Sequence, residues 1–438
     1  MSFDAIIRTD TTEIALADGV IAALEPAGTL ADDAREIVDA HGLDVLPGLI
    51  DAHVHFNDPG RASWEGWGSG TRALAAGGFT CGVDMPLNSD PPTVNVLALE
   101  AKLAAAKGAA HVDFAVWGGL VPGNVEHMEE LAAAGVVGFK AFMADSGIDD
   151  FAACDDLSLY EGMCRAAQLG LPVAVHAENA VIVRELGRRA IAAGRTGMAD
   201  FAASRPVAAE VAAIATAIAI AEEAGCALHI AHVSSGRGAV LVAEARAAGA
   251  DVSCETCPHY LALSAEDAER IGVLAKCAPP LRNAEERHGL RRAVRDGTID
   301  YIASDHSPAP PRLKEGHAFS AWGGISGCQT TARVLLAEGL TSKDVAFLCS
   351  VAPALRLRLP GGLLEPGANA DLLLLDPAPT AALTSSELEY RHPHSPFTGR
   401  ALRGRVARTM LRGRTVAIDG RSVGEPRGQF VWPLLQHR

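Results

Sequence analysis

Histidine and aspartate side chains stand where apolar, strand-like runs of this sequence end. His53 and His55 are separated by one residue, so in a strand both imidazoles point to the same side. His176, His232 and Asp305 each close a later apolar run. Imidazole nitrogens and carboxylate oxygens are ligands that borderline divalent metal ions accept. The pattern therefore predicts a metal site assembled from distant parts of the chain.

A lysine stands inside another apolar run. Lys140 lies between the apolar segments 135–139 and 141–143, where a bare ammonium group would be costly to desolvate. Beside two metal cations a protonated amine would also be repelled, whereas an amine carbamylated by carbon dioxide becomes a carboxylate that can bridge both ions. A lysine whose tip extends to the mouth of the fold explains the same pattern. On the residues alone, both interpretations stay open.

These side chains need a fold that gathers the ends of many strands. Short apolar, β-rich runs alternate with longer alanine-rich stretches of helical composition, such as Ala98–Lys107 and Val207–Gly225. Eight such runs are found: Asp44–His55, Phe79–Met85, Val112–Trp117, Val136–Phe142, Pro172–His176, Ala227–Val233, Ala250–Glu255 and Ile299–Asp305. Eight β/α units predict an α/β protein with a TIM barrel, whose active site lies at the carboxyl ends of its strands.

Both ends of the chain have a different pattern, with strand-like stretches broken by Gly, Asp and Pro. These stretches are Phe3–Arg8, Glu13–Leu24, Asp371–Leu375 and Val406–Ile418. They predict one small β-sandwich built from both chain ends. Leu46-Pro47-Gly48 marks the entrance to the barrel and Pro360-Gly361-Gly362 marks its exit. The predicted domains are therefore 1–49 for the first part of the sandwich, 50–360 for the barrel, and 361–438 for the rest of the sandwich and the tail.

Composition and charge limit the kinds of molecule that this protein is expected to bind. Apolar residues make up 49% of the chain and charged residues 21%, which is typical of a large globular protein. The formal net charge is −15 and no basic stripe is present, which argues against nucleic acid as a partner. The chain starts without a signal-like segment, and its longest apolar run, Val211–Ala221, is shorter than the roughly 18 residues of a membrane span. We therefore expect a cytoplasmic protein that does not bind membranes.

The nine cysteines are scattered and odd in number, which favours reduced thiols over a disulfide framework. Cys254 and Cys257 form one CxxC pair. Without a second pair or a thioredoxin-like context, this pair does not indicate a structural zinc or redox site.

The order and spacing of the candidate ligands resemble the cyclic amidohydrolases, the family of dihydroorotases, hydantoinases and allantoinases. In that family two divalent metal ions are bridged by a carbamylated lysine. The resemblance implies that His53, His55 and Asp305 hold one ion, that His176 and His232 hold the other, and that Lys140 bridges both. Zinc is the expected metal, although sites of this kind also accept cobalt, manganese or iron.

Shorter motifs resemble the allantoinases within that family, and they extend over almost the whole chain. They are the segments 53–61, 64–67, 84–89, 117–124, 138–143, 255–261, 276–282, 304–308 and 394–399. Dihydroorotases carry an arginine for the substrate carboxylate two residues after the HxH pair, and Asn57 stands there in this chain. Cys81 and Ala309 depart from the allantoinase pattern, but neither is a candidate ligand.

The resemblance implies hydrolysis of the cyclic amide bond of allantoin to give allantoate. Two cations sharing a water molecule would supply a hydroxide nucleophile near neutral pH, and Asp305 would take its proton and pass it to the leaving nitrogen. Asn88, Cys277 and Ala278 are candidate contacts for the N–H and C=O groups of the ring, and turn residues would explain them equally well. His229, His259 and His306 are expected to support the site or the core. Relatives are commonly homotetramers, so a homo-oligomer is expected.

Two other functions are compatible with parts of this pattern. A hydantoinase or dihydropyrimidinase would share every metal ligand, so only the choice of substrate separates it from an allantoinase. A non-catalytic scaffold built on the same barrel would be expected to lack part of the ligand set. All six ligand positions are filled in this sequence, which favours an enzyme.

Overall fold

A barrel and a β-sandwich make up the computed structural model, which describes residues 3–434. This confirms the fold class predicted from the sequence. The barrel strands are β6 (Leu49–Val54), β7 (Phe79–Asp84), β8 (Asp113–Val116), β9 (Gly118–Gly119), β10 (Phe139–Phe142), β11 (Val173–His176), β12 (Leu228–Ile230), β13 (Val252–Thr256) and β14 (Tyr301–Ile302). All of these residues are buried, as expected for parallel strands covered on both faces.

The barrel strands are paired in parallel and in chain order. One run of pairing joins β6, β7 and β8, and a second joins β9 through β14. The second run returns to the first where Val54 at the end of β6 pairs in parallel with His306. The first and the last predicted barrel runs therefore lie side by side although some 250 residues separate them in the chain.

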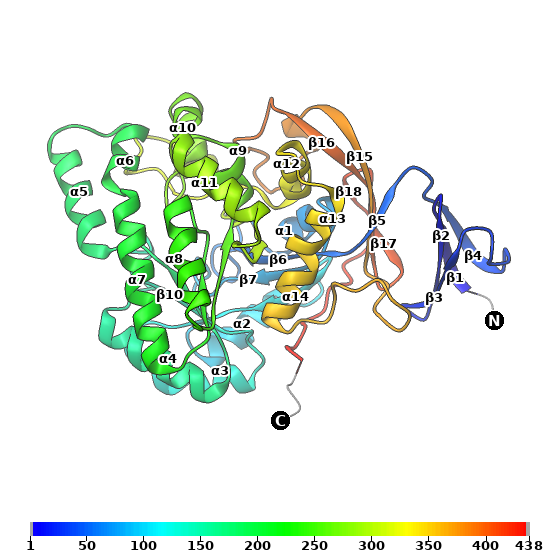
Figure 1. The fold of residues 1–438 in the computed structure, drawn as a ribbon, viewed down its shortest axis with the longest axis horizontal. Coiled ribbons are helices and arrows are strands. Elements are labelled where there is room, and N and C mark those ends of the chain that lie inside the picture. The colour runs from blue at the N-terminus through cyan, green and yellow to red at the C-terminus, as the bar shows by residue number, and fades with distance from the viewer. Residues whose placement is uncertain (1–2, 435–438) are drawn as a thin grey trace.

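Helices surround the barrel, and Figure 1 shows α4, α7, α8 and α11 along its outer side. The helices are α1 (Trp67–Ala76), α2 (Val96–Ala106), α3 (Met128–Ala133), α4 (Asp156–Leu169), α5 (Ala180–Ala192), α6 (Met198–Ser204), α7 (Val207–Ala224), α8 (Gly236–Ala247), α9 (Pro258–Ala262), α10 (Ala265–Ile271), α11 (Ala284–Arg295), α12 (Thr331–Ala337), α13 (Ser342–Ala346) and α14 (Ala352–Leu357). Two of them, α5 and α6, are inserted between β11 and α7. No helix within residues 3–434 has the length and apolar character needed to cross a bilayer.

The sandwich is made of two sheets, one built from N-terminal strands alone and one in which C-terminal strands pair with a strand from the N-terminal part of the chain. One sheet has the order β3-β2-β1-β4 and the other the order β18-β17-β16-β15-β5. Their strands are β1 (Phe3–Arg8), β2 (Thr12–Ala17), β3 (Val20–Pro26), β4 (Ala34–Asp39), β5 (Asp44–Pro47), β15 (Leu372–Ala382), β16 (Ala401–Leu411), β17 (Arg414–Ile418) and β18 (Arg421–Ser422). Ile7 and Leu16 from the first sheet share one apolar cluster with Leu372 and Met410 from the second. This shared core holds the two chain ends together.

Three of the strand-like stretches named from the sequence are divided in the structure, and one of them, Val406–Ile418, spans β16 and β17. The run Asp44–His55 splits at Gly48 into β5, which pairs with β15 of the sandwich, and β6, which begins the barrel. A side chain at Gly48 would collide with Thr80, since its Cβ would lie 2.2 Å from that hydroxyl oxygen. The stretch Glu13–Leu24 is likewise a hairpin, and it turns at Asp18, which has a positive φ of 52°. Apolar periodicity alone does not reveal such changes of partner.

The C-terminal segment closes one side of the barrel. Phe114 of β8 donates its backbone N–H to Gln429 O at 3.0 Å and accepts from Val431 N at 2.8 Å. Trp432 packs on Gly135, where a Cβ atom would lie 2.6 Å from the indole ring. The segment therefore acts as an additional short strand beside β8.

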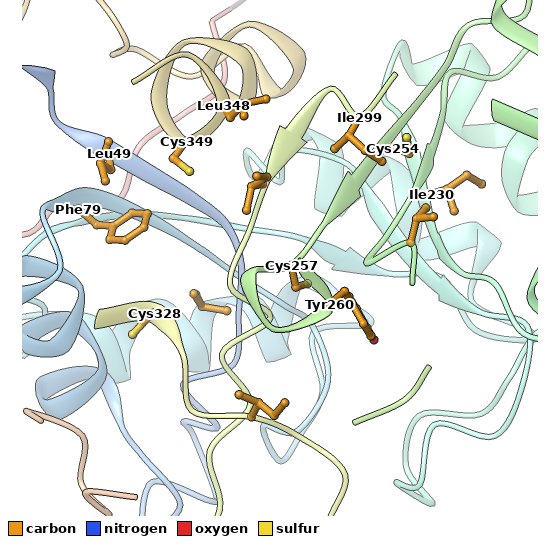
Figure 2. Packing of buried hydrophobic residues seen from close by; sticks show 14 of the residues in the cluster. Leu49, Phe79, Ile230, Cys254, Cys257, Tyr260, Ile299, Cys328, Leu348 and Cys349 are labelled. Carbon is orange, nitrogen blue, oxygen red and sulfur yellow. The ribbon is translucent and has the colours of Figure 1, made fainter. Parts of the chain in front are cut away.

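The cysteines within residues 3–434 are free thiols, and most are buried. Cys254 and Cys257 belong to the large apolar cluster of the barrel, together with Cys328 and Cys349. In Figure 2, Cys254 lies near Ile299 while Cys257 lies near Tyr260. The CxxC pair thus contributes to core packing.

A buried ion pair anchors the strand that carries the two neighbouring histidines. Lys102 of α2 donates its ammonium to the Asp84 carboxylate at the end of β7 and to Met85 O, the latter at 2.7 Å. Asp84 Oδ1 also accepts from Phe56 N at 2.8 Å, directly after β6. Both charged side chains are almost completely buried, with exposures of 0% and 1%. Each charge depends on the other, because neither is in contact with water.

Replacing the lysine is therefore expected to destabilise the protein strongly. Lys102→Met would leave the Asp84 carboxylate buried without its cation, and the free energy of unfolding should fall by about 3–5 kcal/mol in urea denaturation. Lys107→Met, at an exposed position just after the same helix, is the matched control and should change it by less than about 0.5 kcal/mol. The double variant Asp84→Asn with Lys102→Met should recover part of the loss. A loss below about 1 kcal/mol for Lys102→Met would contradict this assignment.

Candidate metal centre

Three of the predicted ligands meet at the carboxyl ends of the first and last barrel strands. His53 lies in β6, His55 directly follows it, and Asp305 lies three residues after β14. Asp305 Oδ1 is 3.3 Å from His53 Nε2 and 3.4 Å from His55 Nε2. One ligand atom from each residue lies within 4.8 Å of the others, so the three atoms can surround a single ion. His53 and His55, one residue apart, therefore turn their imidazoles to the same side, as their spacing predicted.

The backbone between β6 and β14 fixes this meeting point. Asp51 Oδ1 accepts from Ser304 N at 3.0 Å, on the residue before Asp305. His55 N donates to His306 O at 2.8 Å, on the residue after it. Asp305 is therefore held on both sides by residues of the strand that carries its partner histidines.

The other two predicted histidines face each other nearby. His176 Nδ1 lies 3.1 Å from His232 Nε2, and their rings are 4.7 Å apart. The His232 ring is also 5.4 Å from the ring of His53, which is in turn 5.4 Å from that of His55. All four imidazoles thus lie in one continuous cluster at the end of the barrel.

Two buried glutamates orient these rings. Glu255 Oε1 is 2.5 Å from His53 Nδ1, and Glu178 Oε2 is 2.8 Å from His176 Nε2. In each ring this leaves the other nitrogen facing the cluster. Carboxylates that hold the far nitrogen of a metal-binding histidine are common around metal sites, because they set the tautomer and the ring direction. His229 Nε2 lies 3.4 Å from Glu255 Oε2, so it supports that carboxylate.

Sequence reasoning did not assign a role to either glutamate. Glu178 lies two residues after His176, and Glu255 ends the seventh predicted run, so both had the strand-end position that identified the ligands. His306 and His259 are buried as expected, with rings packed on Tyr390 and Tyr260 respectively.

Burial and neighbouring charges set the protonation states of the cluster. Burial raises the pKa of Asp305, but His53 and His55 outweigh it and lower the pKa to about 2. Burial lowers the pKa of His53 and His176, and it lowers that of His232 well below the usual value. The carboxylate is therefore ionised and these three imidazoles are neutral, which are the forms that bind metal.

Lys140 lies among these groups without a hydrogen-bond partner. It is the second residue of β10 and is 0% exposed, and within residues 3–434 its Nζ meets no hydrogen-bond acceptor. Burial lowers its pKa to about 8, against the opposing charges of Glu255 and Asp305. Its charge in turn lowers the pKa of His53, His176 and His232. The lysine amine is therefore buried beside this cluster and has no hydrogen-bond partner within the described residues.

The donor set fits a metal-dependent enzyme. His53, His55 and Asp305 can surround one divalent ion, and the imidazoles of His176 and His232 are further suitable ligands close by. A neutral amine reacts with carbon dioxide, and burial of Lys140 favours the neutral form.

A cavity of about 480 Å³ opens above the cluster. His53, His55, His176, His232 and Asp305 line its floor, and the three predicted substrate contacts, Asn88, Cys277 and Ala278, also line it. The outer wall comes from α5, from the end of α6 and from the loop of residues 313–324. The cavity can thus hold a small cyclic molecule against the floor.

Three residues that line this cavity have a positive φ angle, although none of them is glycine. Asn88, His232 and Asp305 have φ values of 70°, 38° and 45°, which non-glycine residues rarely adopt. Such conformations cost roughly 1–3 kcal/mol and persist where the surrounding structure imposes them, often at functional sites.

Comparisons with known proteins agree with this geometry. The model of the amidohydrolase family matches residues 45–416. The chain is 56% identical to an allantoinase of Rubrobacter xylanophilus, over 99% of this chain and 98% of that protein. It is 42% identical to an allantoinase of Escherichia coli, over the full length of both.

A solved structure extends the comparison to the fold. An L-hydantoinase (dihydropyrimidinase) from Arthrobacter aurescens superposes with a TM-score of 0.94 at 35% identity, covering 98% of this chain and all of that one. Its barrel and sandwich correspond to those described above. The chain therefore belongs to the amidohydrolase family and, within it, to the cyclic amidohydrolases of the allantoinase type.

Proposed function

We propose that this enzyme hydrolyses the ring amide bond of allantoin and releases allantoate. The observation that carries the proposal is the near full-length identity of 56% to an allantoinase. The cavity supports it, because its polar floor and walls can hold a neutral ureide ring. The ring would lie with its amide carbonyl against the floor.

The six predicted ligands would hold two divalent ions in this proposal. His53, His55 and Asp305 would bind one ion, His176 and His232 the other, and carbamylated Lys140 both. Support comes from the 4.8 Å grouping of the first three residues and from the orphaned amine of Lys140. Bound there, the ions would activate a water molecule and polarise the ring carbonyl.

Asp305 would move the proton in this reaction. Its low pKa keeps the carboxylate ionised, and it lies beside both histidines of β6 at the cavity floor. It can accept a proton from the attacking water and deliver it to the ring nitrogen as the C–N bond breaks. Asn88 and the backbone at Cys277 and Ala278 would orient the ring by hydrogen bonds to its N–H and C=O groups.

We also propose that the protein works in the cytoplasm as a homotetramer, as its resemblance to the family implies. The chain's negative charge and the absence of a spanning helix within residues 3–434 are compatible with that location.

A substrate panel tests the proposed reaction. Enzyme loaded with a defined metal should hydrolyse allantoin with a kcat/KM at least about tenfold above that for hydantoin, dihydrouracil or dihydroorotate, because the cavity walls would contact the ureido group. The similarity to an L-hydantoinase structure is the reason for a second candidate function, that of a hydantoinase. Preference for hydantoin or dihydrouracil would support that candidate and reject allantoin as the main substrate.

Asp305→Asn tests the proton role. The amide keeps the size of the side chain but cannot accept the proton, so kcat should fall by about 10²–10⁴-fold while the fold is retained. Circular dichroism and metal analysis serve as controls for folding and loading. Near-normal turnover would show that another group moves the proton.

Lys140→Ala tests the bridging carbamate. Without the bridge, metal analysis should find fewer than two ions per subunit, and added propionate should restore binding in part by taking the place of the missing carboxylate. Lys107→Ala, an exposed lysine outside the cavity, should bind metal as the parent does. Two ions per subunit and a full rate in Lys140→Ala would rule the bridge out.

A further inference from the structure

The cavity extends well beyond the ligand cluster. Its volume of about 480 Å³ lies in the range of roughly 300–1,000 Å³ that pockets for drug-sized molecules occupy. A five-membered ureide ring is much smaller than such molecules. We use the term outer chamber for the part lined by Arg184 and Arg188 of α5, Arg205 after α6, Lys276, and the loop of residues 319–324. This part lies next to whatever substituent the ring carries.

The outer chamber is basic although the chain as a whole is acidic. The formal net charge of the chain is −15, yet four basic residues line the chamber, while the acidic residues that line the whole cavity within the described chain are Asp145 and, on the floor, Asp305. A ring substituent therefore enters a region of positive potential.

Two of the basic groups are already held by the protein. Arg205 binds the buried Glu178 carboxylate, which also holds His176. Lys276 donates its ammonium to Ala321 O and lies 4.7 Å from the centre of the Phe201 ring. Burial and the charge of Arg205 lower the pKa of Lys276 to about 8, in keeping with a positive potential on this wall.

The two arginines of α5 differ in their contacts. Arg188 pairs with Glu185 at 2.9 Å, and Arg189 pairs with the same carboxylate at 2.7 Å. Arg184 lies one turn before Arg188 and lines the cavity, and within residues 3–434 no carboxylate or carbonyl engages its guanidinium. It is the basic group of the chamber that is free to bind a ligand.

We propose that the outer chamber binds a carboxylate on the ring substituent through Arg184, so that the enzyme also opens hydantoins that carry a short carboxyalkyl chain. The inference rests on the proposed function, because the same floor would cleave the same ring amide. The neutral ureido group of allantoin would occupy the chamber without an ionic contact.

The reaction is the hydrolysis already assigned to the site. The oxygen of water bonds to the ring carbonyl carbon, the bond from that carbon to the ring nitrogen breaks, and a proton from the water goes to that nitrogen. The product is an N-carbamoyl amino acid with two carboxylates, one new and one from the substituent. Nothing is oxidised or reduced, and no co-reactant is needed.

The test compares matched pairs of substrates. Hydantoins with carboxymethyl, carboxyethyl and carboxypropyl chains are assayed beside the carboxamides of the same length, with allantoin as reference, on metal-loaded enzyme. For at least one chain length the carboxylate should exceed its carboxamide in kcat/KM by about three- to fivefold, the size expected for a partly exposed ion pair. The ratio should fall towards one in 0.5 M salt.

Variants on the same helix locate the effect. Arg184→Gln should bring the ratio of carboxylate to carboxamide close to one, and Arg184→Glu should bring it below one. Arg189→Gln, one turn further along α5 and outside the cavity lining, should keep the parental ratio. Binding of the same pairs to the Asp305→Asn enzyme, measured by titration calorimetry, should follow the same order.

The outcomes separate the two proposals. Hydrolysis of allantoin with equal treatment of carboxylates and carboxamides at every chain length would overturn the inference and leave the proposed function intact. If allantoin is not hydrolysed, the proposed function fails, and the calorimetric ratio still decides whether Arg184 binds the carboxylate. A ratio that survives in Arg184→Gln overturns the role of this residue.

Discussion

The junction between the first and last barrel strands is the constraint on which the candidate metal centre depends. Val54 pairs with His306, and the Asp51 carboxylate accepts the backbone N–H of Ser304. These contacts place Asp305 opposite His53 and His55 across a sequence gap of some 250 residues. Asp51 makes this contact while completely buried, and burial raises its pKa to about 7. The contacts that close the barrel therefore also bring the three candidate metal ligands together.

Burial of charge is tolerated around this junction because nearly every group has a partner. Glu255 and Glu178 hold histidines, and Lys102 holds Asp84 at the end of β7, the strand beside β6. An unpaired charge in such a place costs several kcal/mol, so the orphaned amine of Lys140 stands out. Neutralising the amine or converting it to a carboxylate between two cations would relieve that cost. Lys140, the buried amine without a partner within the described residues, is thus the residue that would carry the bridging ligand in the proposed chemistry.

The floor and the wall of the cavity come from different kinds of element. The floor is built from strand ends, which the barrel holds rigidly, whereas α5 and α6 are an insertion between β11 and α7 that forms part of the wall. Arg205 connects the two, because it lines the wall and binds the Glu178 carboxylate behind His176. The cleavage chemistry can therefore be common to relatives such as the L-hydantoinase, while the wall can vary with the substituent on the ring.

The sequence by itself determined the fold class and the identity of the ligand candidates. Apolar runs of strand length alternate with helical stretches, and the end of a strand in such a barrel is where polar side chains meet, so His53, His176 and Asp305 could be named without coordinates. The Leu46-Pro47-Gly48 signal predicted the passage from sandwich to barrel. The pairing of residues 44–47 with β15, by contrast, could not be predicted, because an apolar run has the same periodicity whether it pairs with the sandwich or with the barrel.

Only the tertiary structure decided which groups support the ligands and which remain free. Glu178 and Glu255 became significant through their distances to histidine nitrogens, and Arg184 through the lack of a partner within the described chain. The structure also shows that Lys140 is completely buried and that its amine has no hydrogen-bond partner within the described residues. The partners and the burial of a side chain depend on residues that folding brings together from distant parts of the chain. Local sequence patterns do not contain information about those neighbours.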